Sequence, residues 1–370
     1  MPNHINTPSQ PVLLLTGATG QIGRQVLRAW LQTGHRVVIT LRDPGRQWPT
    51  LRQWLTQQGV ATEGVDCVAT DFALADFGWT PQARGLLQCV TCVVHLAAMW
   101  GWHLRWPAAN EVNVQGTVRL HAWAAGQGMA GPFVGVCGFM SQVPGQLDSM
   151  GLRDPHVDWA SAAKKWGAYE VSKLRVYLAL HPSQCKPGAL PVTWIHPAGV
   201  IGDASLPEVP AQSAVAGILR AIQRGRLRLV PGSPAAVVPW VTGQYVARYV
   251  LALLLTSDDV ASDHLLLDPA SPSLRTCVNL MARAMGAPSA VGHLPKWVMR
   301  GLLKIPGVAG LMGSSAESLN FSVSALPDPA DSVQWGLRQG IAHPDVLASL
   351  DLTARHWLAT QRRQSTAVRT

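Results

Sequence analysis

Two side chains in this sequence, Tyr169 and Lys173, have the types and the spacing needed to move a proton. Residues four apart in a helix lie on one face, a turn from each other. A free phenol has a pKa of about 10, and a nearby ammonium group favours the phenolate and lowers that pKa. The pair could therefore exchange a proton with a substrate oxygen. The alternative is a chance pair on the surface of a helix.

A second chemical signal is the glycine-rich run that contains Gly17, Gly20 and Gly23. The apolar segment Leu13–Leu15 precedes it, and a helical apolar pattern follows as far as Leu31. A strand, a tight turn and a helix in this order present backbone N–H groups to a pyrophosphate. A purely structural glycine turn is the alternative, but the flanking elements favour a nucleotide site.

The end of the expected second strand, 36–41, bears on the choice of nucleotide. In a dinucleotide fold, a carboxylate about 20 residues after the first glycine binds both ribose hydroxyls. Here Arg42 follows the strand directly, and Arg46 comes soon after. A guanidinium suits a 2′-phosphate, so the sequence favours NADP(H) over NAD(H). In the alternative interpretation, Arg42 is a solvated loop residue and Asp43 binds the ribose.

These signals require a scaffold in which strands and helices alternate. The pattern predicts helices at 48–58 and 109–126 and strands at 65–69, 90–96 and 133–136. Such alternation indicates an α/β fold, a Rossmann-like doubly wound parallel sheet.

The domain organisation follows from this pattern. We expect a disordered tail at 1–10 and an NAD(P)-binding Rossmann domain at 11–195, with late strands from 196–270 interleaved into its sheet. A smaller C-terminal substrate lobe would occupy mainly 196–370.

Composition limits the class of protein. The 370 residues are 48% hydrophobic and 14% charged, which is typical of a well-packed globular protein. The net charge is +9, but the basic residues are scattered, so we expect no nucleic-acid partner. No apolar run is long enough to span a membrane, and the first ten residues do not resemble a signal peptide. We expect a cytoplasmic monomer or homodimer.

Six cysteines are present, and Cys89 and Cys92 form a single C-x-x-C pair. A zinc site would need a second pair at ligand spacing, which the sequence lacks. We therefore expect reduced cysteines and no metal.

The whole set of motifs resembles the extended short-chain dehydrogenase/reductase family. The segments that carry this resemblance are, in order, Thr16 to Gly23, Asp71, His95 to Ala98, Asn113, Tyr169 to Lys173 and His196 to Gly202. The last segment is similar to the family's R-P-x-x-V-Y-G, with His196 in place of arginine. The resemblance covers nearly the whole chain and is closest to the hydroxysteroid dehydrogenase and dihydroflavonol reductase branch.

This resemblance implies roles for particular residues. Tyr169 would be the acid/base, and Lys173 would bind the nicotinamide ribose and lower the tyrosine pKa. Asp71 would meet the adenine amine. Asn113 could instead pin the backbone of the fourth strand, and His95 is expected to be a packed histidine at a strand end. The implied cofactor-binding residues are Gly17, Thr19, Gly20, Gln21, Ile22, Gly23, Arg42, Asp71, Phe72, Ala97, Ala98, Asn113, Lys173 and Pro197.

One position departs from the family. After the fifth strand the family carries Ser or Thr, which donates a hydrogen bond to the reacting oxygen, whereas this chain has Gly138. The nearest hydroxyl belongs to Ser141. We expect Ser141 either to take over that catalytic role, facing the nicotinamide cleft, or to cap a turn.

The substrate is expected to be an apolar small molecule. Trp100, Trp102 and Trp106 follow the fourth strand at the sheet edge where ligands bind, and could wall a pocket or pack a lid. Gln244-Tyr245 replaces a frequent acidic pair of the family, which argues against sugar nucleotides. The segment 294–312 could touch a membrane surface, cover the pocket or simply pack in the lobe.

Three functions remain open. The first is an NADP(H)-dependent oxidoreductase that transfers hydride between the cofactor and a hydroxyl or carbonyl of an apolar molecule. The second is a nucleotide-sugar epimerase or dehydratase. The third is a non-catalytic NAD(P)-binding sensor, which the glycine at 138 makes credible, although a sensor need not keep the Tyr169 and Lys173 pair.

Overall fold

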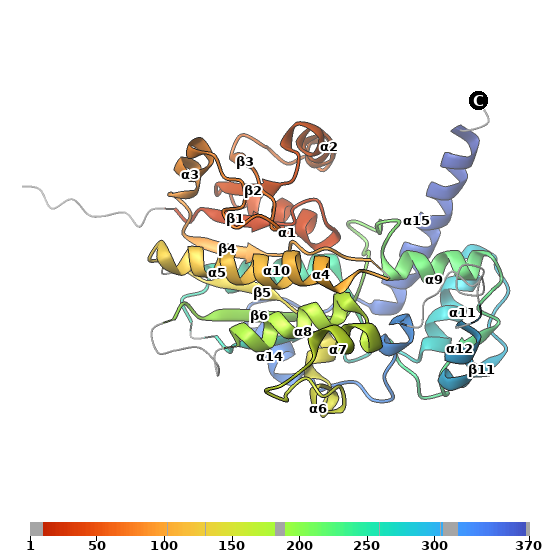
Figure 1. Ribbon diagram of the computed structural model, residues 1–370. Helices are drawn as coiled ribbons and strands as arrows, with labels where there is room; N and C mark the ends of the chain where they lie inside the picture. The colour runs from red at the N-terminus through yellow and green to blue at the C-terminus, as the bar shows by residue number, and fades with distance from the viewer. Residues whose placement is uncertain are drawn as a thin grey trace, which may run out of the picture.

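A seven-stranded parallel sheet forms the centre of the protein (Figure 1). The computed structural model describes residues 10–101, 103–129, 131–181, 189–258, 260–303, 305 and 317–367. The strand order is β10-β6-β5-β4-β1-β2-β3. Successive strands are added outward from β1 on one side and from β4 on the other, so the strand order switches between β1 and β4. The predicted α/β doubly wound fold is confirmed. The strands are β1 (Leu13–Thr16), β2 (Val37–Leu41), β3 (Val65–Ala69), β4 (Cys92–His95), β5 (Phe133–Val136), β6 (Val192–Pro197) and β10 (Asp263–Leu266).

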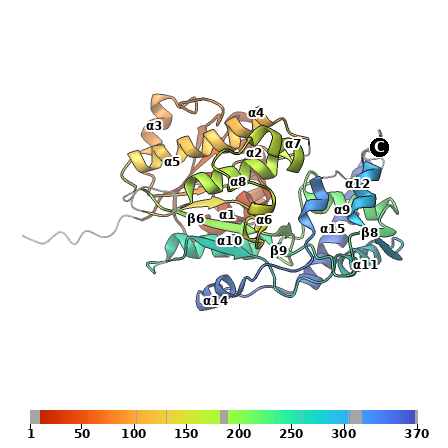
Figure 2. The ribbon, with the colours of Figure 1, turned by 60° about the horizontal axis from the view of Figure 1, so that its bottom comes forward.

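Alternating apolar residues of the strands feed two separate cores. Leu13 and Leu15 of β1 point into one core and Leu14 into the other, because side chains alternate across a sheet. Figures 1 and 2 show α5 and α8 on one face and α1 and α10 on the other. The helices of the Rossmann part are α1 (Gln21–Leu31), α2 (Pro44–Gln57), α3 (Pro81–Leu87), α4 (Trp106–Ala109), α5 (Gly116–Gly126), α6 (Gln146–Ser149), α7 (Trp159–Trp166), α8 (Ala168–Leu180) and α10 (Gly243–Leu255).

Two predicted helices differ from the structure, one at its start and the other by an internal break. α2 begins before the predicted residue 48, because the Asp43 carboxylate accepts a hydrogen bond from the Arg46 N–H at 3.1 Å and caps the helix at Pro44. The helix expected at 109–126 is divided, because a π-helical turn at Asn110–Gln115 separates α4 from α5. This turn carries Asn113 toward the segment that follows β4.

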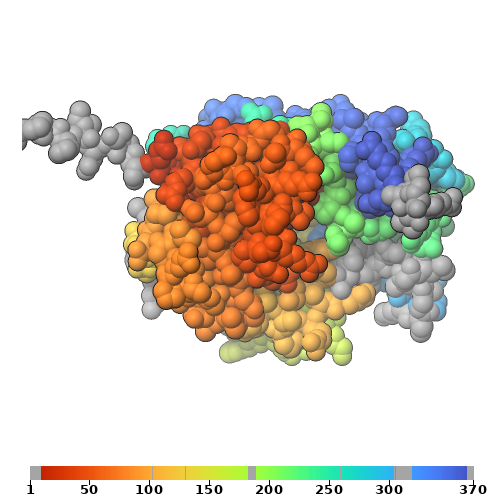
Figure 3. All heavy atoms as spheres, turned by 90° about the horizontal axis from the view of Figure 1, so that it is seen from above, coloured from red at the N-terminus to blue at the C-terminus, as the bar shows by residue number. Residues whose placement is uncertain are grey.

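The C-terminal lobe has a core of its own, built from helices and two small parallel sheets. Its elements are β7 (Gly199–Ile201) paired with β9 (Trp240–Thr242), β8 (Leu229–Pro231) paired with β11 (Gly292–Leu294), and the helices α9 (Ala214–Gln223), α11 (Leu274–Met285), α12 (Lys296–Leu303) and α15 (Val346–Ala367). In Figure 3 the red and orange N-terminal residues occupy one side of the molecule, and the green and blue residues of the lobe lie beside them.

The boundary between the two parts is not a single point in the chain. A division after residue 195 falls inside β6, which continues to Pro197 because it pairs with β10 up to that residue. After entering the lobe, the chain returns with α10 against α1, and with α14 (Ala330–Arg338) against β10. Of the expected disordered tail, residues 1–9 lie outside the described residues.

Among the helices that the structure describes, none combines the length and the apolarity required to cross a bilayer.

Candidate active site

The glycine-rich loop between β1 and α1 leaves no room for a side chain at Gly17 or Gly23. Gly17 has φ +68°, and a Cβ on it would lie 2.7 Å from the backbone nitrogen of Ala97. A Cβ on Gly23 would lie 2.0 Å from the carbonyl oxygen of Gly17. The Gly20 N–H donates to the same carbonyl at 2.9 Å. This tight turn, open at the start of α1, fits the pyrophosphate of a dinucleotide.

A buried hydrogen-bond chain holds the loop against β4. The Thr16 hydroxyl accepts from the N–H of Ala97 at 3.0 Å and lies 2.8 Å from Nδ1 of His95. Nε2 of His95 lies 2.8 Å from the Thr117 hydroxyl. Burial, with a smaller contribution from the Lys173 charge, lowers the pKa of His95 to about 3. His95 is therefore a neutral packed histidine, as the sequence predicted.

Tyr169 and Lys173 lie on α8, and both line the central cavity. Burial lowers the pKa of Lys173. Burial, followed by the charges of Glu170 and Cys137, raises the pKa of the Tyr169 phenol well above its usual value. The expected lowering of the phenol pKa by Lys173 is therefore wrong for this structure, because loss of solvation dominates. The phenol is protonated at neutral pH.

Asn113 positions α8 from outside the cavity. Its amide oxygen accepts from the Met99 N–H at 2.7 Å, and its amide nitrogen donates to the Met99 carbonyl at 3.0 Å and to the Ser172 hydroxyl at 2.9 Å. Asn113 does not line the cavity. Its contacts match the structural alternative, since it ties the segment after β4 to the helix that carries Tyr169.

A cavity of about 630 Å³ runs from the glycine loop past Tyr169 into the lobe. Its Rossmann end is lined by the predicted cofactor residues Gly17, Thr19, Gly20, Gln21, Ile22, Gly23, Ala98, Lys173 and Pro197. Its lobe end is mainly apolar and includes Ile218, Leu227, Trp240, Val278, Met299 and Leu319. Two cationic side chains, Arg226 and Lys296, also line it.

Two other predicted residues, Arg42 and Asp71, are exposed after β2 and β3, at the sheet edge where the cofactor loop lies. One oxygen of Asp71 accepts from the Ala73 N–H at 2.8 Å and closes a local turn. Asp43 caps α2, so its carboxylate is already engaged. This removes part of the support for a ribose contact by Asp43.

Phe72 and Ala97, like Arg42 and Asp71, are not among the residues that line the cavity. Phe72 is buried, and its ring centroid lies 5.3 Å from that of His95, so its side chain fills the core beneath the loop. The backbone nitrogen of Ala97 bonds to Thr16, and its methyl group packs against the same core. Both residues support the loop from behind.

Ser141 does not face the cavity, contrary to the catalytic prediction. Its hydroxyl donates to the Gly138 carbonyl at 2.8 Å and lies 2.6 Å from Nδ1 of His196. Nε2 of His196 lies 2.9 Å from Asp263. The buried network holds the Ser141 hydroxyl away from Tyr169, which agrees with its turn-capping alternative.

Sequence reasoning missed the partners in this network. Asp263 lies on β10 and bridges to β6, far away in sequence. Hydrogen bonds from His196 and Ser262 hold its pKa below the usual range although burial opposes this. No local motif marks such a pair.

The tryptophans after β4 do not all lie at the cavity. Trp100 lines the cavity, and its ring lies edge-on to that of Tyr169, with centroids 6.4 Å apart. Trp106 packs into the core near the Arg175 guanidinium instead. Trp102 lies outside the described residues. Trp100 therefore matches the expected wall of a pocket.

The segment 294–312 contributes to the cavity through α12. Met299 is buried and lines the cavity, whereas Trp297 is 77% exposed. This geometry supports the pocket-covering alternative for α12. Residues 304 and 306–312 of the segment lie outside the described residues.

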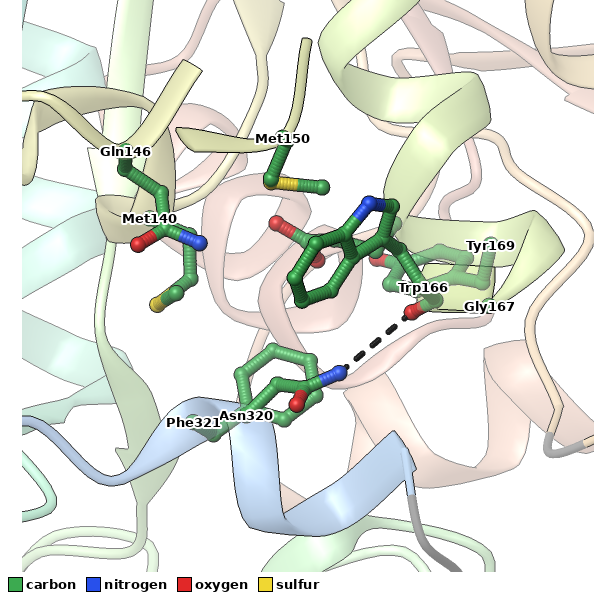
Figure 4. A pocket seen from close by; sticks show the side chains of 9 residues that line it. Met140, Gln146, Met150, Trp166, Gly167, Tyr169, Asn320 and Phe321 are labelled. Atoms are coloured by element: carbon green, nitrogen blue, oxygen red, sulfur yellow. Dashed lines mark hydrogen bonds between the residues drawn. The ribbon is translucent and has the colours of Figure 1, made fainter. Parts of the chain in front are cut away.

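A side pocket adjoins the cavity beside Tyr169 (Figure 4). Met140, Met150 and Trp166 line it from the Rossmann part, and Phe321 closes it from the lobe. The Asn320 amide donates to the Trp166 carbonyl at 3.5 Å, which joins the two parts. Glu170, which the sequence analysis did not single out, lines both spaces.

Within the described part of the chain, no three His, Cys, Asp or Glu side chains are grouped so that they could hold a metal ion.

A family model for the Male sterility protein matches residues 15–250, more than half of the chain. The chain belongs to this family. The Male sterility protein family is an NAD(P)-binding branch of the extended short-chain dehydrogenase/reductases, so the resemblance found in the sequence is confirmed. Its proteins are NAD(P)-dependent reductases and epimerases.

Individual relatives match parts of the chain. The nonribosomal peptide synthetase inpA of Emericella nidulans is 30% identical over 152 residues, which cover 36% of this chain and 10% of that protein. The NAD-dependent epimerase/dehydratase FUM13 of Gibberella moniliformis is 39% identical over 90 residues, which cover 24% of each protein. The matches thus span about a tenth and about a quarter of these curated relatives.

A solved structure with the same fold is the terminal R domain from the myxalamid PKS-NRPS biosynthetic pathway. It has a TM-score of 0.70 and 19% identity, with 96% of this chain and 92% of that chain covered.

The tight loop yields a first prediction. Gly23→Ala should weaken binding of reduced nicotinamide dinucleotides by about tenfold or more, because the added methyl would lie 2.0 Å from the Gly17 carbonyl oxygen and displace the loop. Fluorescence titration of the bound cofactor measures this. Gly126→Ala is the control, since a Cβ there meets open space. Equal affinity in the two variants would contradict the role of the loop.

Proposed function

We propose that this protein is an NADPH-dependent reductase that converts the carbonyl of an apolar substrate to a hydroxyl. The observation that carries the proposal is the placement of Tyr169 and Lys173 on the wall of one cavity. That cavity begins at the glycine loop and ends among apolar side chains of the lobe. A cofactor and an apolar substrate can therefore meet beside one proton donor.

The state of Tyr169 favours reduction. A bound reduced nicotinamide supplies a hydride to the carbonyl carbon, and the carbonyl oxygen then needs a proton. Loss of solvation raises the pKa of the Tyr169 phenol, which is therefore protonated and can donate that proton. Lys173 lies one turn along the helix, where its ammonium would bind the ribose and stabilise the phenolate that forms. The low solvation that raises the phenol pKa also strengthens this charge interaction.

The preference for NADPH rests on Arg42. It is exposed directly after β2, and the neighbouring Asp43 carboxylate is committed to the cap of α2. An exposed guanidinium beside a carboxylate of which one oxygen already caps α2 favours a ribose 2′-phosphate over two ribose hydroxyls.

The apolar substrate class rests on the lobe end of the cavity. Leu227, Trp240 and Met299 line it, and they give a sugar ring few hydrogen-bond partners. Trp100 continues this apolar wall to Tyr169. A nucleotide-sugar epimerase would need many polar contacts here, so we place that function second.

The peptide-synthetase relatives favour a particular form of the substrate. By name, inpA is a nonribosomal peptide synthetase, and the R domain comes from the myxalamid PKS-NRPS biosynthetic pathway. An acyl group that arrives as a thioester is therefore a second candidate substrate. Its reduction would cleave the C–S bond, release a thiol and leave an aldehyde.

We expect Arg42→Ala to weaken NADPH binding by about tenfold and to leave NADH binding unchanged, because only the phosphate loses a charge-assisted hydrogen bond. Calorimetry with both cofactors measures this. Arg52→Ala, an exposed arginine within α2, is the control. Equal wild-type affinity for NADPH and NADH would contradict the cofactor assignment.

Tyr169→Phe should lower turnover by about a hundredfold or more while NADPH still binds, because the ring remains and only the proton donor is lost. Stopped-flow measurement of NADPH oxidation and a separate binding titration distinguish the two effects. Tyr177→Phe, on the same helix but away from the cavity, is the control. If Tyr169→Phe retained most of its activity, the chemistry would have to lie elsewhere.

A substrate screen tests the function itself. With NADPH, we expect aliphatic or aromatic ketones, aldehydes or acyl thioesters to be reduced, because the lobe end of the cavity is apolar. UDP-sugars should be neither bound nor converted. Conversion of a UDP-sugar would support the epimerase alternative, and cofactor binding without turnover of any class would support a sensor.

A further inference from the structure

The side pocket is a small space that adjoins the cavity beside Tyr169. Its volume is about 20 Å³, against about 630 Å³ for the cavity. A site that admits one water molecule measures about 10–15 Å³, so the side pocket has room for one water molecule or one methyl group. The two spaces share four lining residues, which are Met140, Tyr169, Glu170 and Phe321.

The walls of the side pocket are mainly apolar. Met140 and Met150 are both buried, and Figure 4 shows them with Trp166 and Phe321 around the space. The polar side chains of the lining are those of Gln146, Glu170 and Asn320. The Asn320 amide already donates to the Trp166 carbonyl at 3.5 Å. Most of the wall can therefore contact a hydrocarbon group and offers it no hydrogen bond.

A sharp turn of the chain between α7 and α8 brings this space next to Tyr169. α7 ends at Trp166, and Gly167 follows with φ 103°, a backbone conformation that favours glycine. Tyr169, in the first turn of α8, lines both spaces. Of these two spaces, Trp166 lines the side pocket alone and Trp100 lines the cavity alone. Tyr169 therefore stands where the two spaces meet.

The difference in size between the two spaces limits how a ketone or an aldehyde can bind. A carbonyl carbon carries two substituents besides its oxygen, and they point in different directions. With the oxygen at the Tyr169 hydroxyl, one substituent can enter the cavity and the other the side pocket. A group larger than methyl in the side pocket would have to displace packed side chains such as Met150, and overpacking of this kind is costly.

We propose that the side pocket holds the smaller substituent on the carbonyl carbon of the substrate, a hydrogen atom or a methyl group, while the larger substituent extends toward the lobe end of the cavity. This rests on the proposed reductase function. Met150 and Trp166 are then residues that determine specificity, because they bound the side pocket without lining the cavity. The substrates are accordingly aldehydes and methyl ketones that carry one long apolar chain.

Three ketones with the same number of carbon atoms test this limit. They are methyl hexyl ketone, ethyl pentyl ketone and propyl butyl ketone, which differ in the size of the smaller substituent. In the wild type, kcat/KM with NADPH should fall by about tenfold or more from the methyl to the ethyl compound, because a methylene group without room in the pocket costs that much. The propyl compound should be slower still. Equal kcat/KM values for the three ketones would overturn the proposal.

Met150→Ala enlarges the side pocket and changes no residue that lines the cavity. It should raise kcat/KM for ethyl pentyl ketone relative to methyl hexyl ketone by about tenfold, because the ethyl group gains room. Met285→Ala is the matched control, since this buried methionine of the lobe core lines neither space and should keep the wild-type ratio. A wild-type ratio in folded Met150→Ala protein would contradict the assignment of the pocket.

A measurement without turnover separates this proposal from the reductase function. Wild-type protein with isotopically labelled methionine methyl groups is mixed with NADP⁺ and methyl hexyl ketone, and nuclear Overhauser effects between ketone and methionine protons are recorded. Met150→Leu, which nearly conserves volume, identifies the Met150 signal. The short methyl group of the ketone should contact Met150, and the hexyl chain should contact Met299 at the lobe end of the cavity.

The other outcomes of this measurement have distinct meanings. A hexyl chain in contact with Met150, or a bound ketone without any contact to Met150, overturns the assignment of the side pocket and leaves the reductase function standing. A ketone that does not bind to the wild type contradicts the reductase function itself, on which the assignment rests.

Discussion

The parallel direction of the sheet is the constraint on which the rest of the structure depends. Because β1, β2, β4 and β5 run the same way, their carboxyl ends and the loops that follow them gather at one edge. The glycine loop, Arg42, Trp100 and Gly138 all follow these strands. α8 packs on one face of the sheet, and Tyr169 and Lys173 in its first two turns line the same cavity. Reversal of one strand would move its contribution to the opposite edge and leave the site incomplete.

Local sequence patterns were sufficient for the scaffold. β3 and β5 lie at the predicted residues, because each is a short, largely apolar run between turn signals; β5 is an interior strand of the sheet and β3 is an edge strand. The glycine spacing predicted the tight loop, since Gly23 lies against the Gly17 carbonyl with no room for a methyl group. The same holds for Tyr169 and Lys173, whose shared face follows from helix geometry. These features depend on residues that are close in the chain.

Side-chain directions and distant partners could not be predicted in the same way. The hydroxyl of Ser141 turns toward His196, whose own partner Asp263 comes from a strand far along the chain. The ring of Phe72 completes the core beside His95. Glu170 follows Tyr169 directly, and helical spacing alone places neighbouring side chains on different faces. Only the tertiary arrangement shows that both line one cavity and that burial, rather than Lys173, controls the phenol pKa.

The central claim is that hydride passes from a reduced nicotinamide to a substrate carbon held beside Tyr169. The most direct measurement uses NADPH that carries deuterium at the transferable position of the nicotinamide ring, together with a ketone accepted by the enzyme. Mass spectrometry of the alcohol then locates the label. The account predicts deuterium on the former carbonyl carbon and exchangeable hydrogen from solvent on the oxygen. An alcohol without deuterium, formed while NADPH is consumed, would contradict it.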